Sequence, residues 1–105
     1  DTTWLPLILE ELEDSNVAMR YEAANACGAL SDKSTVPHLI PLIDDDDSEV
    51  QISAIQALGN IGGSLAKRAL LQCLETADEV LEEAVKEALS SIEFENDPLG
   101  FHFST

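Results

Sequence analysis

The sequence is poor in aromatic and in basic residues. Among 105 residues it has three Phe, one Trp and one Tyr, and only five lysines and arginines. Alanine and branched aliphatic residues therefore supply most of its apolar content, a composition that favours closely packed helices over a β-sandwich. With 21 acids the formal net charge is −16. Because a surface of that sign repels phosphate, we expect neither nucleic acid nor an anionic membrane as a partner.

Cysteines and long apolar runs are also scarce. No apolar run approaches the ~18 residues of a membrane span, and no signal-peptide pattern opens the chain. Two cysteines, Cys27 and Cys73, are too few for a disulfide framework. We expect both to be buried free thiols in a protein of the reducing cytoplasm.

Short segments of this sequence recur at a spacing of 31 residues. The pattern is clearest in "AANACGAL" (23–30), "AIQALGNI" (54–61) and "VKEALSSI" (85–92). A period of 20–50 residues indicates stacked structural repeats. Each unit reads as two helices, because apolar residues recur at helical spacing in both of its halves. The pattern predicts helices at 4–13, 16–30, 35–43, 48–61, 65–75 and 79–92.

Glycine, proline and aspartate in fixed places support these helices. Pro37 suits a first helical turn, and Asp47 or Ser48 suits the cap of the next helix. A glycine inside a helix costs about 1 kcal/mol relative to alanine. Its return at Gly28 and Gly59 therefore predicts a close approach between helices. Gly62 or Gly63 is available for the left-handed position that ends the fourth helix.

The segment "VPHLIPLIDDDDSEVQISAIQALGNIGG" (36–63) resembles a HEAT-like repeat of the short kind found in phycobilin lyases, and the resemblance spans residues 5–92. It implies an all-α, right-handed α-solenoid of three helix pairs, with the second helices on the concave side. We expect this solenoid at 1–92 and a tail at 93–105. Arg20 fills the family's arginine position, but Gln51 and Glu82 stand at the equivalent positions later, so a continuous Arg–Asp ladder is not expected.

Polar residues replace apolar ones in the two outer repeats. Glu11 stands where the later repeats have Leu42 and Cys73, and Lys86 stands where the earlier ones have Ala24 and Ile55. Terminal repeats of a solenoid need polar outer faces. We therefore expect a complete three-repeat unit.

No catalytic or metal-binding pattern is found. The run 44–47 lacks the alternating ligands, glycine and final glutamate of a calcium loop, so we interpret it as a capped turn. His38 and His102 are the only histidines, and no Cys/His spacing fits zinc. We expect no cofactor, no metal and no catalysis by this chain.

The remaining candidate for function is the exposed side of the second helices. Rows of residues at equivalent positions run across the three repeats there. The row that contains Tyr21 and Ile52 is more apolar than we would expect of a surface that only faces solvent. An amphipathic groove is a common way to bind a helix or peptide. The predicted contact residues are Tyr21, Glu22, Asn25, Ile52, Ser53, Gln56, Glu83 and Glu87.

The tail "EFENDPLGFHFST" holds all the phenylalanines of the chain, Phe94, Phe101 and Phe103. They either fold back on the third repeat or dock into a partner, and we expect weak, concentration-dependent homodimers through them. The sequence thus predicts a non-catalytic module that binds a protein with a basic or amphipathic surface. The resemblance permits an alternative role as a subunit of a chromophore lyase or maturation factor.

Overall fold

The computed structural model describes residues 5–96, and the side chains as far as Glu93. Two 3₁₀ segments, η1 (Lys33–Thr35) and η2 (Ile40–Asp44), lie on either side of the short third helix. No strand occurs in this part of the chain. The helices are α1 (Leu5–Glu11), α2 (Val17–Leu30), α3 (Val36–Leu39), α4 (Ser48–Ile61), α5 (Ser64–Leu74) and α6 (Glu79–Asn96).

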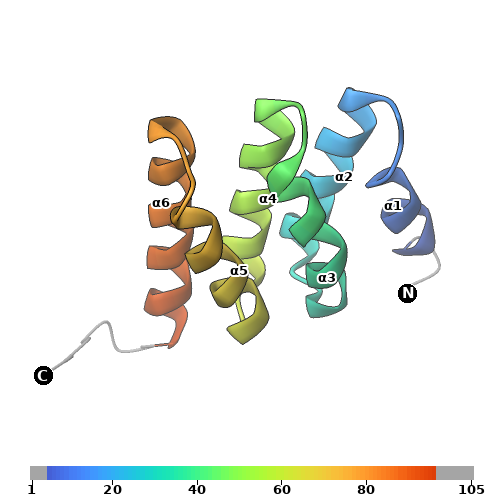
Figure 1. Cartoon of the computed structure of the whole chain (residues 1–105). Coiled ribbons are helices and arrows are strands. Elements are labelled where there is room, and N and C mark those ends of the chain that lie inside the picture. The colour runs from blue at the N-terminus through green and yellow to red at the C-terminus, as the bar shows by residue number, and fades with distance from the viewer. Residues whose placement is uncertain (1–4, 97–105) are drawn as a thin grey trace, which may run out of the picture.

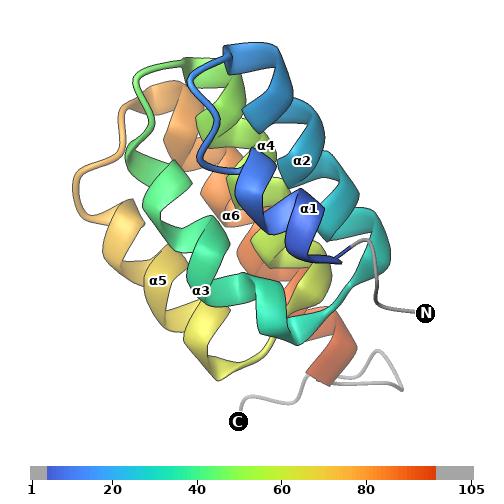
Figure 2. The same ribbon diagram turned by 90° about the vertical axis from the view of Figure 1, so that its right-hand side faces the viewer.

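The helices form two layers. One layer contains α2, α4 and α6 side by side, and the other contains α1, α3 and α5, as Figures 1 and 2 show. The most extensive packing runs between α2 and α4 and between α4 and α6, whereas the helices of the other layer pack mainly on these and hardly on each other. The prediction of an all-α solenoid built from helix pairs is therefore confirmed. We call the layer of α2, α4 and α6 the inner layer and the other the outer layer.

The inner helices begin at equivalent positions of the 31-residue period. Asn16 and Asp47 are the N-caps of α2 and α4, and each side chain accepts hydrogen bonds from two backbone N–H groups of the first turn. Asp78, at the same position before α6, accepts a bond from the N–H of Leu81 at 2.9 Å. The interpretation of 44–47 as a turn that ends in a capping residue is thus confirmed at Asp47.

The third predicted helix, 35–43, is wrong as a single α-helix. The segment is instead η1, then one turn of α-helix, then η2. Pro37 lies in the first turn as expected, but Pro41 lies in the interior, where it removes the N–H that would bond to the carbonyl of Pro37. The chain continues in the tighter 3₁₀ form, which ends with the N–H of Asp45 bonded to the carbonyl of Leu42.

The last helix also differs from its predicted end at residue 92, because α6 continues to Asn96. Positive-φ residues end the two earlier inner helices, Ser31 (φ 54°) after α2 and Gly62 (φ 76°) after α4. The equivalent residue in the third repeat is Glu93, which lies within α6. The expected tail at 93–105 therefore begins inside a helix.

Glycines set the spacing of the inner layer. A Cβ added to Gly28 would lie 3.0 Å from the Cα of Ala57, and one added to Gly59 would lie 2.7 Å from the Cβ of Ala88. The two seams of the inner layer thus repeat one glycine–alanine contact. The predicted close approach at both glycines is confirmed.

The two ends of the stack differ. Lys86 is exposed, whereas Ala24 and Ile55 at the equivalent positions are completely buried. At this position α6 is polar, as expected of a terminal repeat, although Val80 of the same helix is 63% exposed.

The α1–α2 side does not match that expectation. Glu11 is only half-buried, and apolar residues of α2 remain exposed. Met19 is 36% exposed where the equivalent Val50 is buried, and Leu30 is 44% exposed where Ile61 is 5% exposed. The second repeat differs in that α4 packs extensively on α2, whereas no described inner helix lies on the other side of α2.

None of the helices between residues 5 and 96 has the length and apolar character needed to cross a membrane.

Candidate functional site

The predicted contact residues lie on the inner layer, and most of them are accessible. Tyr21 is 40% exposed, and Ile52, one repeat further on, is half-buried. The acidic and amide side chains beside them are exposed, namely Glu22, Asn25, Gln56, Glu83 and Glu87. We call this surface, made by Tyr21, Ile52 and those five residues, the inner face.

Ser53 was expected on this face, and that expectation is wrong. Only 2% of Ser53 is exposed, because it points back from α4 into the seam with α2. Its hydroxyl donates to Oδ1 of Asn25 and lies 3.4 Å from the carbonyl oxygen of Tyr21. Ser53 therefore positions the side chain of Asn25 and is not available to a partner itself.

A groove of about 210 Å³ opens in the other seam, between α4 and α6. Its wall residues Gln56 and Glu87 come from the predicted set, and the bare backbone of Gly59 deepens it. The equivalents of the Asn25–Ser53 pair are here Gln56 and Ala84. Because alanine cannot form that hydrogen bond, the side chain of Gln56 is not held across the seam, and the groove stays open.

Two polar residues of this groove were not predicted. Asn60 and Ser91 line it, each one helical turn after a predicted residue, Gln56 and Glu87 respectively. Residues four apart share one side of a helix. Extending each predicted row by one turn would therefore have found both.

The inner face is acidic. Its charged members are Glu22, Glu83 and Glu87, and all three are exposed. The bases of the inner helices are held by acids: Arg20 by Asp45, and Lys86 by Glu82 at 3.7 Å. The face therefore offers apolar side chains beside carboxylates that pair with no lysine or arginine among the residues the structure describes.

The ion pair between Arg20 and Asp45 connects two repeats. Nε and one terminal nitrogen of Arg20 donate to the two carboxylate oxygens of Asp45 at 2.8 and 3.1 Å. The other terminal nitrogen donates to the carbonyl of Asp14 at 2.7 Å. Burial by itself would raise the pKa of Asp45. The bonds from Arg20 and from the N–H of Asp47, with the charge of Arg20, outweigh burial and lower that pKa.

The later repeats do not continue this pair as a ladder, in agreement with the expectation from their residues. At the position equivalent to Arg20 in the second repeat, Gln51 donates from Nε2 to the carbonyl of Ile43 in η2 at 2.7 Å. This neutral bond stays within one repeat and does not join it to the next. At the third position Glu82 pairs with Lys86 of its own helix.

Both cysteines are free thiols, but they differ in access. Cys27 is fully buried, as predicted, whereas Cys73 is only half-buried. Burial raises the pKa of both thiols, and the nearby carboxylate of Asp44 raises that of Cys73 further. Both shifts disfavour the thiolate, the nucleophilic form of cysteine.

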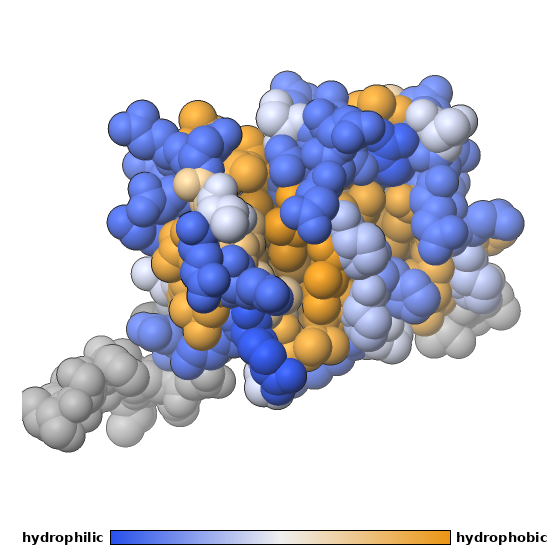
Figure 3. Space-filling view, viewed as in Figure 1, coloured by the Kyte–Doolittle hydropathy of each residue, from blue (hydrophilic) through white to orange (hydrophobic). Residues whose placement is uncertain are grey.

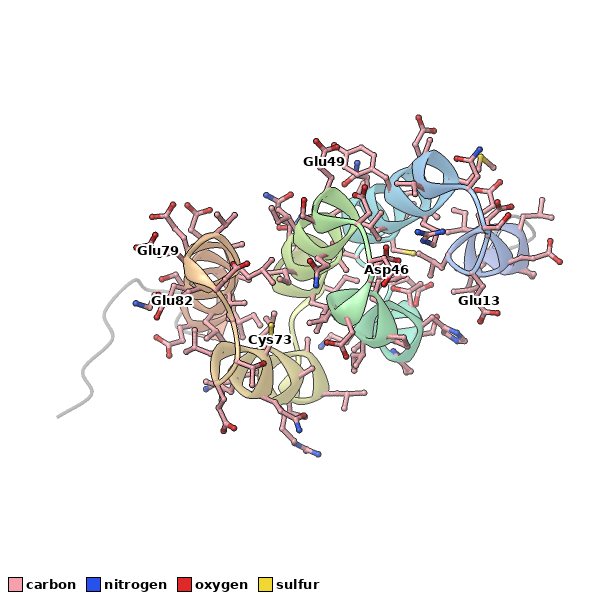
Figure 4. The ribbon with its side chains drawn as sticks, turned by 45° about the horizontal axis from the view of Figure 1, so that its top comes forward. Glu13, Asp46, Glu49, Cys73, Glu79 and Glu82 are labelled. Carbon is pink, nitrogen blue, oxygen red and sulfur yellow. The ribbon has the colours of Figure 1, made fainter. Side chains whose placement is uncertain are left out.

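Acidic side chains gather at one end of the molecule, where the turns within the repeats lie. Figure 4 shows Glu13, Asp46, Glu49, Glu79 and Glu82 spread across this end. Among the described residues, no three or more His, Cys, Asp or Glu side chains are grouped so that they could hold a metal ion. His38 is exposed on α3.

The predicted tail contacts are not located. The side chain of Phe94, and Phe101 and Phe103 entirely, lie outside the described residues.

Comparison with known families agrees with this architecture. The model of the HEAT repeat family matches residues 5–90. This chain is therefore a member of the HEAT repeat family, whose repeats commonly serve as protein-interaction modules. A search of curated proteins found no significant match.

Proposed function

We propose that this chain is a non-catalytic module that binds a protein partner through the inner face. The observation that carries the proposal is the combination of the exposed Tyr21, the adjacent Ile52 and the groove between α4 and α6 on one surface. Surfaces that combine apolar anchors with a groove accept amphipathic helices or peptides.

The negative charge of the inner face indicates the charge expected of the partner. Three exposed carboxylates and a net charge of −16 favour a basic, amphipathic segment. The same charge opposes nucleic acid and anionic membranes as partners. The reducing cytoplasm is the compartment we propose, since both cysteines are free.

The test is affinity capture with three baits, followed by mass spectrometry. The baits are the natural chain, the inner variant Tyr21→Asp with Ile52→Asp, and the outer variant His38→Asp with Leu71→Asp. His38 and Leu71 are both exposed in the outer layer, so the outer variant introduces the same two carboxylates elsewhere. Circular dichroism of each bait checks that helicity is retained.

The proposal predicts proteins captured by the natural chain and the outer variant and lost from the inner variant. Equal loss from both variants, with helicity intact, would show that the inner face is not the contact surface.

The alternative role as a subunit of a chromophore lyase, and membership of the phycobilin-lyase type of HEAT-like repeat, rest on the resemblance of the sequence alone. The two roles differ in one simple measurement. Titration with a linear tetrapyrrole should leave the pigment absorption spectrum unchanged if the chain is a binding module, and should shift it if the chain is a lyase subunit.

A further inference from the structure

The outer layer contains a cleft that no predicted contact residue lines. It lies between η2 and α5 and has a volume of about 360 Å³, near the lower end of the range for binding pockets. Ile40, Ile43, Ala69 and Cys73 supply its apolar wall. Figure 3, which faces the outer layer, shows hydrophobic side chains in this seam with hydrophilic ones around it.

The cleft results from the local sequence. The interior Pro41 turns the second half of the outer helix into the 3₁₀ segment η2, which contacts α5 only weakly. The residues facing α5 from η2 are branched aliphatics, and those facing η2 from α5 include the small Ala69. Side chains of this size do not close the space between the two segments.

Acidic groups stand at the mouth of the cleft. Asp44 and Glu75 line it together with the polar Gln72 and Thr76, and all four are exposed. Asp46 and Glu79, two residues of the acidic end that Figure 4 labels, follow Asp44 and Glu75 closely in the chain. Within the part of the chain that the structure describes, no lysine or arginine lines the cleft.

We infer that this cleft is a second docking site, separate from the inner face, for a peptide segment with one bulky apolar side chain flanked by lysine or arginine. The apolar wall accepts the side chain, and Asp44 and Glu75 pair with the flanking cations. The volume suits one or two anchoring side chains. The charge at the mouth selects a basic segment over a neutral or acidic one.

The probe is a displayed library of random twelve-residue peptides, selected on the whole chain. Selected peptides should share one Leu, Ile, Phe or Trp with at least two Lys or Arg within three positions. A synthetic copy in which the apolar residue is replaced by alanine should bind at least tenfold more weakly. Selection of neutral or acidic sequences would overturn the proposal.

The rate of chemical labelling at Cys73 tests whether the peptide binds in the cleft. Cys73 is half-buried in the cleft wall while Cys27 is fully buried, so a fluorescent maleimide should label Cys73 alone. Figure 4 shows the Cys73 side chain directed from α5 toward the other helices. A saturating selected peptide should slow this labelling at least fivefold. Unchanged labelling at saturation would place the peptide elsewhere and refute the assignment.

Charge reversal with a matched control completes the test. Asp44→Lys with Glu75→Lys should weaken binding of the selected peptide by about tenfold or more in fluorescence anisotropy. Glu10→Lys with Glu13→Lys makes the same change of net charge at exposed positions of the first repeat and should leave the affinity within twofold. Equal weakening by both pairs would mean attraction to net charge alone and would overturn the proposal.

Two other occupants give different results. If labelling of Cys73 slows as the protein concentration rises without peptide, the cleft is an interface between copies of this chain. If removal of residues after Asn96 speeds the labelling, the chain's own C-terminal segment occupies the cleft. Either result would overturn the proposal, and neither bears on the inner face.

Discussion

At the scale of single residues, Arg20 fixes the geometry of the first two repeats. Its guanidinium spans from the carbonyl of Asp14 in its own repeat to the carboxylate of Asp45 in the next. The side chain of Asp45 is only 6% exposed and also accepts the N–H of Asp47, the residue that caps α4. The carboxylate of Asp45 therefore contacts both Arg20 of α2 and the residue that caps α4.

Replacing Asp45 by asparagine should lower the free energy of unfolding at neutral pH. It should also make that free energy fall less as the pH is lowered. The folded protein holds the pKa of Asp45 below its unfolded value of about 3.9. The pair therefore stabilises fully above that pH, and the stabilisation is lost as the pH falls through the folded pKa. Urea unfolding of the natural chain and of Asp45→Asn should differ at pH 7 and converge at low pH.

The control for this prediction is Asp46→Asn, which removes the same charge from the exposed neighbouring position. It should leave the urea midpoint at pH 7 nearly unchanged. Acidification also relieves the repulsion within a chain of net charge −16, but this affects all three proteins. A constant difference between the natural chain and Asp45→Asn down to the lowest pH would contradict the role of the ion pair.

Among polar residues, sequence reasoning succeeded for Asp47, which acts on its own helix, and failed for Ser53 and Asp45, whose contacts join two helices. Asp47 was predictable as a cap because capping is local. The burial of Ser53 was not, since it depends on which side of α4 faces α2 and on the hydrogen bond to Asn25. The sequence does not show which acid of the run 44–47 pairs with Arg20. That choice depends on the conformation of the turn, which brings Asp45 to Arg20.

At the scale of helices, the glycine–alanine contacts determine how closely the inner layer packs. Glycine inside a helix is unfavourable by about 1 kcal/mol relative to alanine, so both glycines would gain from substitution if packing allowed it. The gap between the helices does not allow it at Gly59, where an added Cβ meets both Cα and Cβ of Ala88 at less than 3.0 Å.

We therefore expect Gly59→Ala to destabilise the chain by about 1–3 kcal/mol in urea unfolding, because overpacking outweighs the gain in helix propensity. Gly28→Ala should be milder, since its nearest contacts are at 3.0 and 3.1 Å. Adding Ala88→Gly to Gly59→Ala restores the space and should recover part of the loss. A stabilised Gly59→Ala protein would show that the contact is not tight.

The number and type of these helices could be predicted from the sequence, because a 31-residue period repeats the same apolar pattern three times. The internal boundaries were less predictable. Pro41 lies in a segment whose apolar residues recur at helical spacing but removes one of the hydrogen bonds of a helix, and that conflict produced η2. The end of α6 was also missed, because the helix continues through Glu93, the position at which Ser31 and Gly62 take positive φ and end α2 and α4.

At the scale of the whole molecule, the two layers present different surfaces. The inner layer is continuous and holds an acidic, partly apolar face, whereas the outer layer is divided and leaves a cleft between η2 and α5. Exposed carboxylates are present on both surfaces, on the inner face and at the mouth of the cleft. Any partner is therefore expected to be basic. Its binding should weaken with added salt, because at physiological ionic strength exposed charges more than about 8 Å apart are already largely screened and more salt shortens that distance.

The C-terminal phenylalanines lead to a prediction about self-association. Burying one phenylalanine contributes roughly 1.5–3 kcal/mol, and ordering each residue of the segment costs about 1–2 kcal/mol. For a segment of several residues the ordering cost offsets or exceeds what two phenylalanines contribute, so contacts through Phe101 and Phe103 should give only weak dimers. In sedimentation velocity at high concentration, the natural chain should shift toward dimer and a chain truncated after Asn96 should not. Identical behaviour of the two would remove any role of the tail in association.

The most direct measurement of binding at the inner face places an environment-sensitive dye on each layer. Gln56→Cys puts the dye in the middle of the inner face and Leu71→Cys puts it on the outer layer, both in a Cys73→Ser background with Cys27 left buried. Each labelled protein is titrated with the partner obtained by affinity capture. We predict a saturable emission shift at residue 56 and none at residue 71. A shift at residue 71 with no change at residue 56 would contradict binding through the inner face.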